Sequence, residues 1–119
     1  MATSKQAVLE FLRKFKDAMT NGERGLDIIP REENNRTIVE LGLTRRNIEN
    51  EILGLTALDY CSGPEPDRTR PGVIWEFGKN IVLQEIYIKL KLAENGDQKI
   101  AKCISFHIAN HKINYPLRK

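Results

Sequence analysis

The chain has 119 residues, of which 40% are hydrophobic and 29% are charged. This length corresponds to about one domain, and the composition supports a folded core, which argues against a disordered chain. The two cysteines lack CxxC spacing, so there is no sign of a disulfide framework or a zinc ribbon. We find no apolar run of the roughly 20 residues that cross a bilayer and no signal-peptide pattern, so we expect a cytoplasmic protein with no membrane partner.

Residues 4–20 have apolar side chains at three- and four-residue spacing, which predicts a helix. Thr3 and Gln6 match a capping box at its start. Asn21-Gly22 is typical of a helix end. The first strong pattern of the chain is therefore helical.

Between this helix and residue 60, the sequence predicts one extended segment and two further helices. Residues 25–30 are short, partly β-branched and end in proline, so we expect an edge strand or an extended connector. Residues 33–42 predict a short helix that ends in glycine. Thr44 begins a second helix, which ends at Gly54-Leu55, and residues 56–60 predict one more helical turn.

Residues 61–72 contain three prolines and two glycines, so we expect a long connection without regular structure. Strand-like runs follow at residues 73–78, 85–92 and 100–108. The segment Glu94-Asn95-Gly96-Asp97 between the last two is a hairpin signal.

This order of elements predicts a single domain over residues 1–119 with an α+β fold. Helices of residues 1–60 would pack on one face of a small antiparallel β-sheet formed by residues 73–108, and a basic tail, residues 109–119, would follow. Residues 1–60 carry a net charge of −1 and residues 61–119 a net charge of +4. The basic half favours a polyanionic partner, although the same charge also serves solubility alone.

Side chains alternate between the two faces of a strand, so the apolar set of each strand predicts which residues oppose it. If all three apolar sets face the helices, the other face carries Glu76, Tyr87, Lys89, Cys103, Ser105 and His107. Burying both apolar sets of the hairpin requires pairs such as Tyr87 opposite Ser105, which an odd loop, Asn95-Gly96-Asp97, would produce. His107 would then lie opposite Glu85.

An acid, a phenol, an ammonium group and an imidazole on one face suit the cleavage of RNA by its own 2′-hydroxyl. The reaction needs a base for the hydroxyl proton, a cation for the phosphorane and an acid for the departing 5′-oxygen. Glu76 or His107 could be the base, Lys89 the cation, and His107 or Tyr87 the acid, with no metal or other cofactor. The same side chains also fit a merely solvated strand face with a surface ion pair.

Two other chemistries are compatible with single residues of this set. Cys103, His107 and His111 are spaced by four, which would make a metal site on a helix but does not converge on a strand. Cys61 or Cys103 with His107 would make a thiol–imidazole pair, but no helix N-terminus activates either thiol.

The run ELGLTRRNIENEILGLTALDY, followed by VIWE, IYIKLKL and ISFH, resembles the MqsR family of bacterial type II toxin–antitoxin systems over roughly residues 5–108. The resemblance implies a RelE-like fold and a metal-independent endoribonuclease, an mRNA interferase that inhibits translation. It also implies a cognate antitoxin protein encoded nearby.

By the same resemblance, the family's glutamine after the tryptophan falls on Glu76, and its tyrosine and lysine of one strand fall on Tyr87 and Lys89. The lysine of its terminal S-F-K motif falls on His107. A further family lysine falls near Cys61, where this chain has no basic residue. We expect an arginine of the proline-rich segment to supply that cation, and four basic residues to hold flanking RNA phosphates: Arg68, Arg70, Lys91 and Lys102.

The sequence therefore predicts a toxin-type endoribonuclease that acts on mRNA. A second hypothesis is a non-catalytic RNA- or protein-binding regulatory domain of the same fold. A third is a small interaction domain that does not bind RNA.

Overall fold

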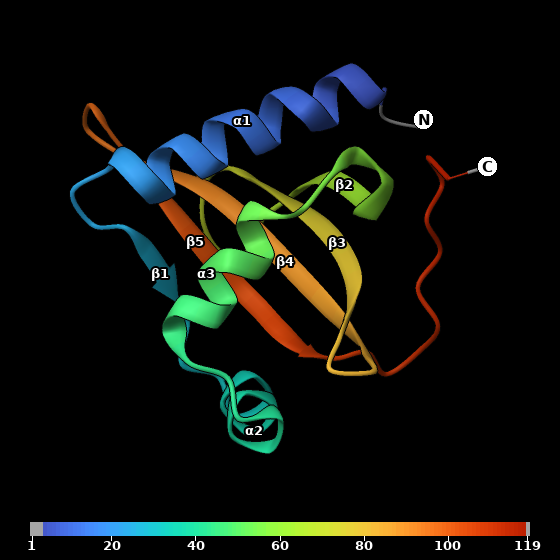
Figure 1. Cartoon of the computed structure of the whole chain (residues 1–119). Coiled ribbons are helices and arrows are strands. Elements are labelled where there is room, and N and C mark those ends of the chain that lie inside the picture. Colours follow the sequence, from blue (N-terminus) through green and yellow to red (C-terminus); the bar gives the residue numbers. More distant parts are fainter. Residues whose placement is uncertain (1–3, 119) are drawn as a thin grey trace.

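The computed structural model describes residues 4–118 (Figure 1). These residues form three α-helices, a 3-10 turn and a five-stranded mixed sheet, which confirms the α+β class. In chain order the elements are α1 (Lys5–Asn21), β1 (Leu26–Ile28), α2 (Glu32–Leu41), α3 (Arg45–Leu53), η1 (Ala57–Asp59), β2 (Tyr60–Pro66), β3 (Val73–Ile81), β4 (Gln84–Asn95) and β5 (Gln98–Ile108). No helix within residues 4–118 is long and apolar enough to cross a membrane.

The helices begin and end close to the predicted residues because local capping chemistry sets their limits. At the start of α1 the Ser4 side chain accepts a hydrogen bond from the backbone N–H of Ala7; the predicted capping residue Thr3 lies outside the described residues. Gly42 ends α2 in the left-handed conformation, with φ of 66°. Thr44 forms a capping box with Asn47 at the start of α3.

The strand order of the sheet is β1-β5-β4-β3-β2. Strands β2 to β5 are antiparallel, which the sequence predicted for β3 to β5. Strand β1 pairs with β5 in parallel, so the prediction of a purely antiparallel sheet is wrong. The pattern of residues 25–30 correctly indicated an edge strand. It carried no information on the partner strand or on the direction of pairing, because both depend on where the chain lies relative to β5 after it leaves α1.

The prediction of an irregular segment over residues 61–72 is wrong for its first half. Residues Tyr60–Pro66 form the edge strand β2, which pairs with β3 through two register shifts. Prolines are tolerated here because an edge strand has one side without a hydrogen-bonded neighbour. Gly63 permits the close pairing: its φ is 108°, and a Cβ atom would lie 2.6 Å from the Ile74 carbonyl oxygen.

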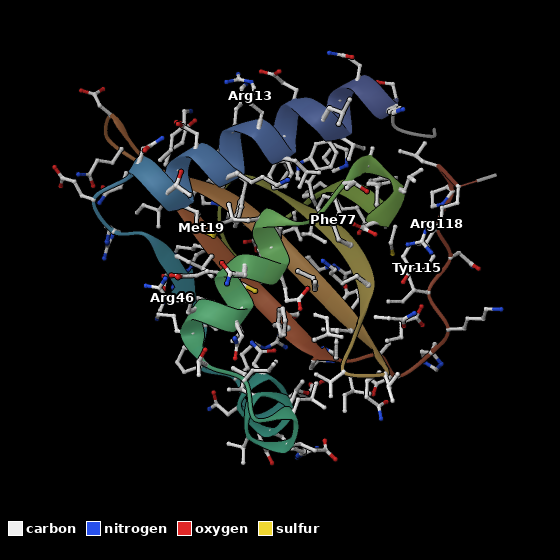
Figure 2. All side chains as sticks on the ribbon, in the orientation of Figure 1. Arg13, Met19, Arg46, Phe77, Tyr115 and Arg118 are labelled. Carbon is white, nitrogen blue, oxygen red and sulfur yellow. The ribbon has the colours of Figure 1, made fainter. Side chains whose placement is uncertain are left out.

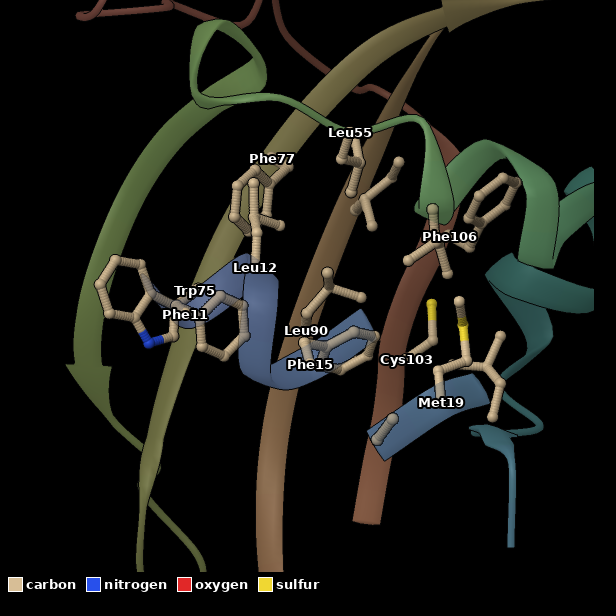
Figure 3. Close-up of a cluster of buried hydrophobic side chains, with 14 of the residues drawn as sticks. Phe11, Leu12, Phe15, Met19, Leu55, Trp75, Phe77, Leu90, Cys103 and Phe106 are labelled. Carbon is tan, nitrogen blue, oxygen red and sulfur yellow. The ribbon is translucent and has the colours of Figure 1, made fainter. Parts of the chain in front are cut away.

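Helices α1 and α3 cover one face of the sheet, and the core lies between them and the strands (Figure 1). Aromatic side chains dominate one end of this core, where Phe11 stacks on Trp75 with ring centroids 4.8 Å apart (Figure 3). The side chain of Cys103 also lies in this core and is fully buried. Its predicted place on the opposite face is therefore wrong.

A β-bulge explains the position of Cys103. The β4–β5 hairpin has a two-residue turn, Gly96-Asp97, and not the predicted three-residue loop. Pairing shifts by one residue between Lys89 opposite Ser105 and Leu90 opposite Cys103, so Ile104 is the extra residue of β5. The apolar residues Ile86, Ile88 and Leu90 of β4 and Phe106 of β5 are buried as expected, but Ile104 is half-buried and Cys103 takes its place in the core.

The bulge also changes which polar residues face each other. Tyr87 lies directly opposite His107, whereas the sequence predicted Tyr87 opposite Ser105 and His107 opposite Glu85. The real register brings the phenol and the imidazole closer together than expected. We call the sheet surface opposite α1 and α3 the polar face; it carries Glu76, Tyr87, Lys89, Ser105 and His107.

Helix α2 closes the outer edge of β5 where the short strand β1 ends. The fully buried Asn34 amide donates to the carbonyl oxygens of Ile29 and Ile104 and accepts from the N–H of Phe106. Thr37 accepts a hydrogen bond from the N–H of Ile108. Side chains of α2 thus take the place of a neighbouring strand along this edge.

The C-terminal segment after β5 packs on the polar face over Gly78, which is paired with Tyr87 across the strands. The Glu85 carboxylate accepts hydrogen bonds from the N–H of Ile113 and the hydroxyl of Tyr115. Arg118 lies 3.7 Å from the Tyr115 ring and donates to Asp59 of η1. Tyr115 and Arg118 lie together on this segment in Figure 2. The predicted basic tail is therefore docked against the sheet.

Gly78→Ala is expected to destabilise this docking. A Cβ atom at Gly78 would lie 2.5 Å from Ile113 Cδ1 and 2.8 Å from the Tyr115 hydroxyl, so the segment must move. Overpacking of this kind costs about 1–3 kcal/mol. Urea unfolding should show that loss, whereas Asn80→Ala, an exposed position on the same strand, should be nearly neutral. Equal unfolding midpoints for the two variants would contradict the docking.

Candidate functional site

Four predicted site residues lie together at the centre of the polar face. Glu76 of β3 is paired across the strands with Lys89 of β4, and the Tyr87 hydroxyl donates a hydrogen bond to Glu76 Oε1. The rings of Tyr87 and His107 have their centroids 5.4 Å apart. Lys89 Nζ lies 5.7 Å from the centre of the Tyr87 ring, which is cation–π distance. The structure thus brings the acid, phenol, ammonium group and imidazole together.

The environment of Tyr87 keeps its proton in place. Burial, and next the hydrogen bond to the Glu76 carboxylate, raise the pKa of Tyr87 well above its ordinary value. At neutral pH the side chain is therefore a hydroxyl donor, and Glu76 is the acceptor in the pair. Tyr87 is therefore not the base of this pair at neutral pH, which leaves the Glu76 carboxylate as the candidate.

His107 has hydrogen-bond acceptors at both ring nitrogens. Its Nδ1 lies 2.9 Å from the Ile108 carbonyl oxygen, and its Nε2 lies 3.4 Å from Glu33 Oε2 of α2. These two contacts, with the backbone of β5 and with the carboxylate of Glu33, orient the imidazole on the polar face.

Helix α2 also places an arginine on the polar face. Arg31, the residue before α2, donates from Nη1 to the Ser105 hydroxyl at 3.1 Å. Sequence reasoning missed both Arg31 and Glu33. They are separated from their partners by 74 residues along the chain, and no local spacing indicated that α2 lies beside β5.

Lys91, one of the predicted phosphate-binding residues, is buried in an ion pair. Its side chain is 6% exposed, and its Nζ lies 2.7 Å from Asp67 Oδ2 in the connection between β2 and β3. Asp67 also accepts hydrogen bonds from the backbone N–H groups of Thr69 and Arg70. Lys91 is therefore an internal anchor for this connection, and its charge is already paired.

Two of the other predicted phosphate-binding residues line one cleft at the end of the sheet. Arg70 and Lys102 face a cavity of about 630 Å³, and Arg24, from the loop after α1, joins them. Arg24 was not predicted. Arg68 is exposed in the same connection as Arg70 but does not line this cleft. The structure thus separates a basic cleft (Arg24, Arg70 and Lys102) from the central cluster around Tyr87.

The Lys91–Asp67 pair predicts a pH dependence of stability. The hydrogen bond from Lys91, and next that from the Thr69 N–H, hold the pKa of Asp67 well below its usual range. A carboxyl group whose pKa is lower in the folded state stabilises the fold above its unfolded pKa, about 3.9. This stabilisation is lost as the pH falls below that value toward the folded pKa.

Asp67→Asn is therefore expected to be less stable than the wild type at pH 7, with a difference that shrinks below about pH 4. Urea unfolding midpoints at a series of pH values measure this difference. Asp97→Asn, in the exposed β4–β5 turn, is the matched control and should show neither effect. A difference between Asp67→Asn and wild type that does not change with pH would contradict the account.

The two cysteine-based alternatives are not supported by the geometry. Cys103 lies on the core face, away from His107, and burial raises its pKa to about 12. Burial, and next the Glu76 charge, raise the pKa of Cys61 to about 11. Neither thiol is activated. Within residues 4–118, no group of three or more His, Cys, Asp or Glu side chains is arranged to hold a metal ion.

Comparison of the chain with protein-family models, with curated proteins and with solved structures found no match. The functional inference therefore rests on the residues of the polar face and on the motifs in the sequence.

Proposed function

We propose that the protein is a toxin-type endoribonuclease with a RelE-like fold, similar to the MqsR family, which cleaves mRNA in the cytoplasm without a metal ion. One observation carries the proposal. A contiguous cluster of four functional groups lies on the sheet face opposite the hydrophobic core. It consists of the Glu76 carboxylate, the Tyr87 phenol, the Lys89 ammonium group and the His107 imidazole.

In the proposed reaction, the 2′-oxygen of RNA attacks the adjacent phosphorus and the bond from phosphorus to the 5′-oxygen breaks. Glu76 takes up the proton of the 2′-hydroxyl, with Tyr87 hydrogen-bonded beside it. His107 gives a proton to the departing 5′-oxygen. The products are a 2′,3′-cyclic phosphate and a 5′-hydroxyl, so atoms and charges balance without an added water.

The positive charge near these groups supports RNA as the substrate class. Lys89 lies beside Tyr87 and would stabilise the charge that develops on the phosphate. The basic cleft would hold phosphates further along the strand, as contacts that position RNA without reading its sequence.

Incubation of the purified protein with a mixed transcript in EDTA tests the proposal. Discrete new ends that carry a 5′-hydroxyl are expected. Tight, salt-dependent RNA binding without new ends would instead support the non-catalytic alternative, a regulatory domain that binds RNA through the same face. If the protein neither cleaves nor binds RNA, both the nuclease proposal and the RNA-binding alternative are contradicted.

The resemblance also supports a cognate antitoxin as partner. Expression of the protein alone should arrest growth, and co-expression of a small protein encoded beside it should relieve the arrest. If growth arrest persists when each neighbouring reading frame is co-expressed, the toxin–antitoxin assignment is contradicted but the nuclease chemistry is not.

A further inference from the structure

Arg31 occupies a position next to the central cluster that no sequence motif had assigned. Its guanidinium donates to the hydroxyl of Ser105, which lies directly opposite Lys89 in the β4–β5 pair. The pair Lys89–Ser105 is two residues along the strands from the pair Tyr87–His107, a step of about 7 Å. Arg31 and Lys89 therefore flank the same small area beside the phenol and the imidazole.

Hydrogen bonds fix the backbone of Arg31. Its backbone N–H donates to the Ile29 carbonyl oxygen, and its own carbonyl oxygen accepts from the N–H of Asn35 in the first turn of α2. The buried Asn34 fastens this turn to β5. The guanidinium is thus held over Ser105 by a rigid element, although the side chain itself is exposed.

Neither Arg31 nor Lys89 has a carboxylate partner among residues 4–118. Two nearby cations are in contrast paired: Arg36 lies 2.9 Å from Glu32, and Lys91 lies 2.7 Å from Asp67. Arg31, which contacts the Ser105 hydroxyl, and Lys89, which lies across the strands from Ser105, are thus two cations without a carboxylate partner, and an anion would bring the missing charge.

We propose that Arg31 is a catalytic residue that binds the non-bridging oxygens of the scissile phosphate together with Lys89, while the buried Ser105 hydroxyl holds the guanidinium in place. This inference rests on the proposed nuclease function. A guanidinium presents N–H groups in a planar fork that matches two phosphate oxygens. Arg31 thereby supplies the cation that the sequence had led us to expect from Arg68 or Arg70. Arg70 instead lines the basic cleft beside Lys91, further along the strands.

The test compares single-turnover cleavage of an oligoribonucleotide with a mapped site by wild type, Arg31→Ala, Arg31→Lys and Arg46→Ala. Arg46 is the matched control, an exposed arginine on α3, on the other side of the sheet, and its variant should cleave at the wild-type rate. Arg31→Ala should lower kcat by about 10²–10³-fold, as the loss of one preorganised donor to a developing charge does, with a much smaller change in KM. Arg31→Lys should recover part of this loss, because it keeps the charge but not the fork.

A second readout reports contact with the phosphate itself. Wild type should discriminate between the two diastereomers of a phosphorothioate at the scissile bond, and Arg31→Ala and Arg31→Lys should lose part of that discrimination. If kcat of Arg31→Ala stays within about twofold of wild type, or the diastereomer preference is unchanged in both variants, the assignment of Arg31 is overturned. Absence of cleavage by the wild type would instead overturn the nuclease proposal, and the role of Arg31 with it.

Discussion

Glu76→Gln is expected to reduce the rate of RNA cleavage by about 10²–10⁴-fold, the usual contribution of a positioned general base. Glutamine keeps the shape of the side chain, and its amide oxygen still accepts the hydrogen bond of the Tyr87 hydroxyl. The melting temperature should therefore change little, while the proton acceptor is lost. Glu10→Gln, an exposed position on α1 on the other side of the sheet, should cleave at the wild-type rate.

His107→Ala and Tyr87→Phe test the other half of the same cluster. Both should relieve growth arrest on expression, because the first removes the proposed proton donor and the second removes the hydroxyl that lies between it and Glu76. Melting temperatures of the purified variants control for folding. Arrest that persists at equal protein level in these variants, together with full activity of Glu76→Gln, would show that the reaction does not use this cluster.

The second large effect concerns stability. Asn34→Ala is expected to lower the free energy of unfolding by roughly 3 kcal/mol or more, since each buried polar group left without a partner costs about 1–3 kcal/mol. The change removes the partners of the Ile104 carbonyl oxygen and the Phe106 N–H on the covered edge of β5, and that of the Ile29 carbonyl oxygen. In a domain of this size the melting temperature should fall by about 10 °C.

Thermal and urea unfolding measure this loss, and Asn35→Ala provides the control at the next, exposed position of α2. Because Asn34 also fixes the start of α2, the variant should lose the precise placement of Arg31 and Glu33, and cleavage should fall even below its melting temperature. If the free energies of unfolding of Asn34→Ala and Asn35→Ala differ by less than about 0.5 kcal/mol, α2 does not replace a strand at this edge.

Local chemistry made most elements predictable. The helix of residues 5–21 follows from apolar spacing, and the ends at Gly42 and Thr44 follow from capping preferences that act within one turn. The polar face was predictable for the same reason. Alternation along β3 and β4 depends only on the strand itself, so it selected Glu76, Tyr87 and Lys89 correctly.

Interactions between distant segments were not predictable from local patterns. A bulge at Ile104 reverses the alternation along β5, which kept His107 on the polar face but moved Cys103 into the core. A proline-rich sequence such as that of β2 forms a strand only because a partner strand is present to receive it. Arg31 depends on where α2 docks, which contacts across more than 70 residues decide.

The most direct test of the central claim, that the polar face promotes attack by the 2′-hydroxyl of RNA, replaces that single hydroxyl. An oligoribonucleotide that carries 2′-deoxyribose only at the mapped cleavage position should remain intact, while the all-ribose version yields a 2′,3′-cyclic phosphate and a 5′-hydroxyl. Cleavage of the 2′-deoxy substrate at the same bond would contradict the account, because the attacking group would then have to come from elsewhere.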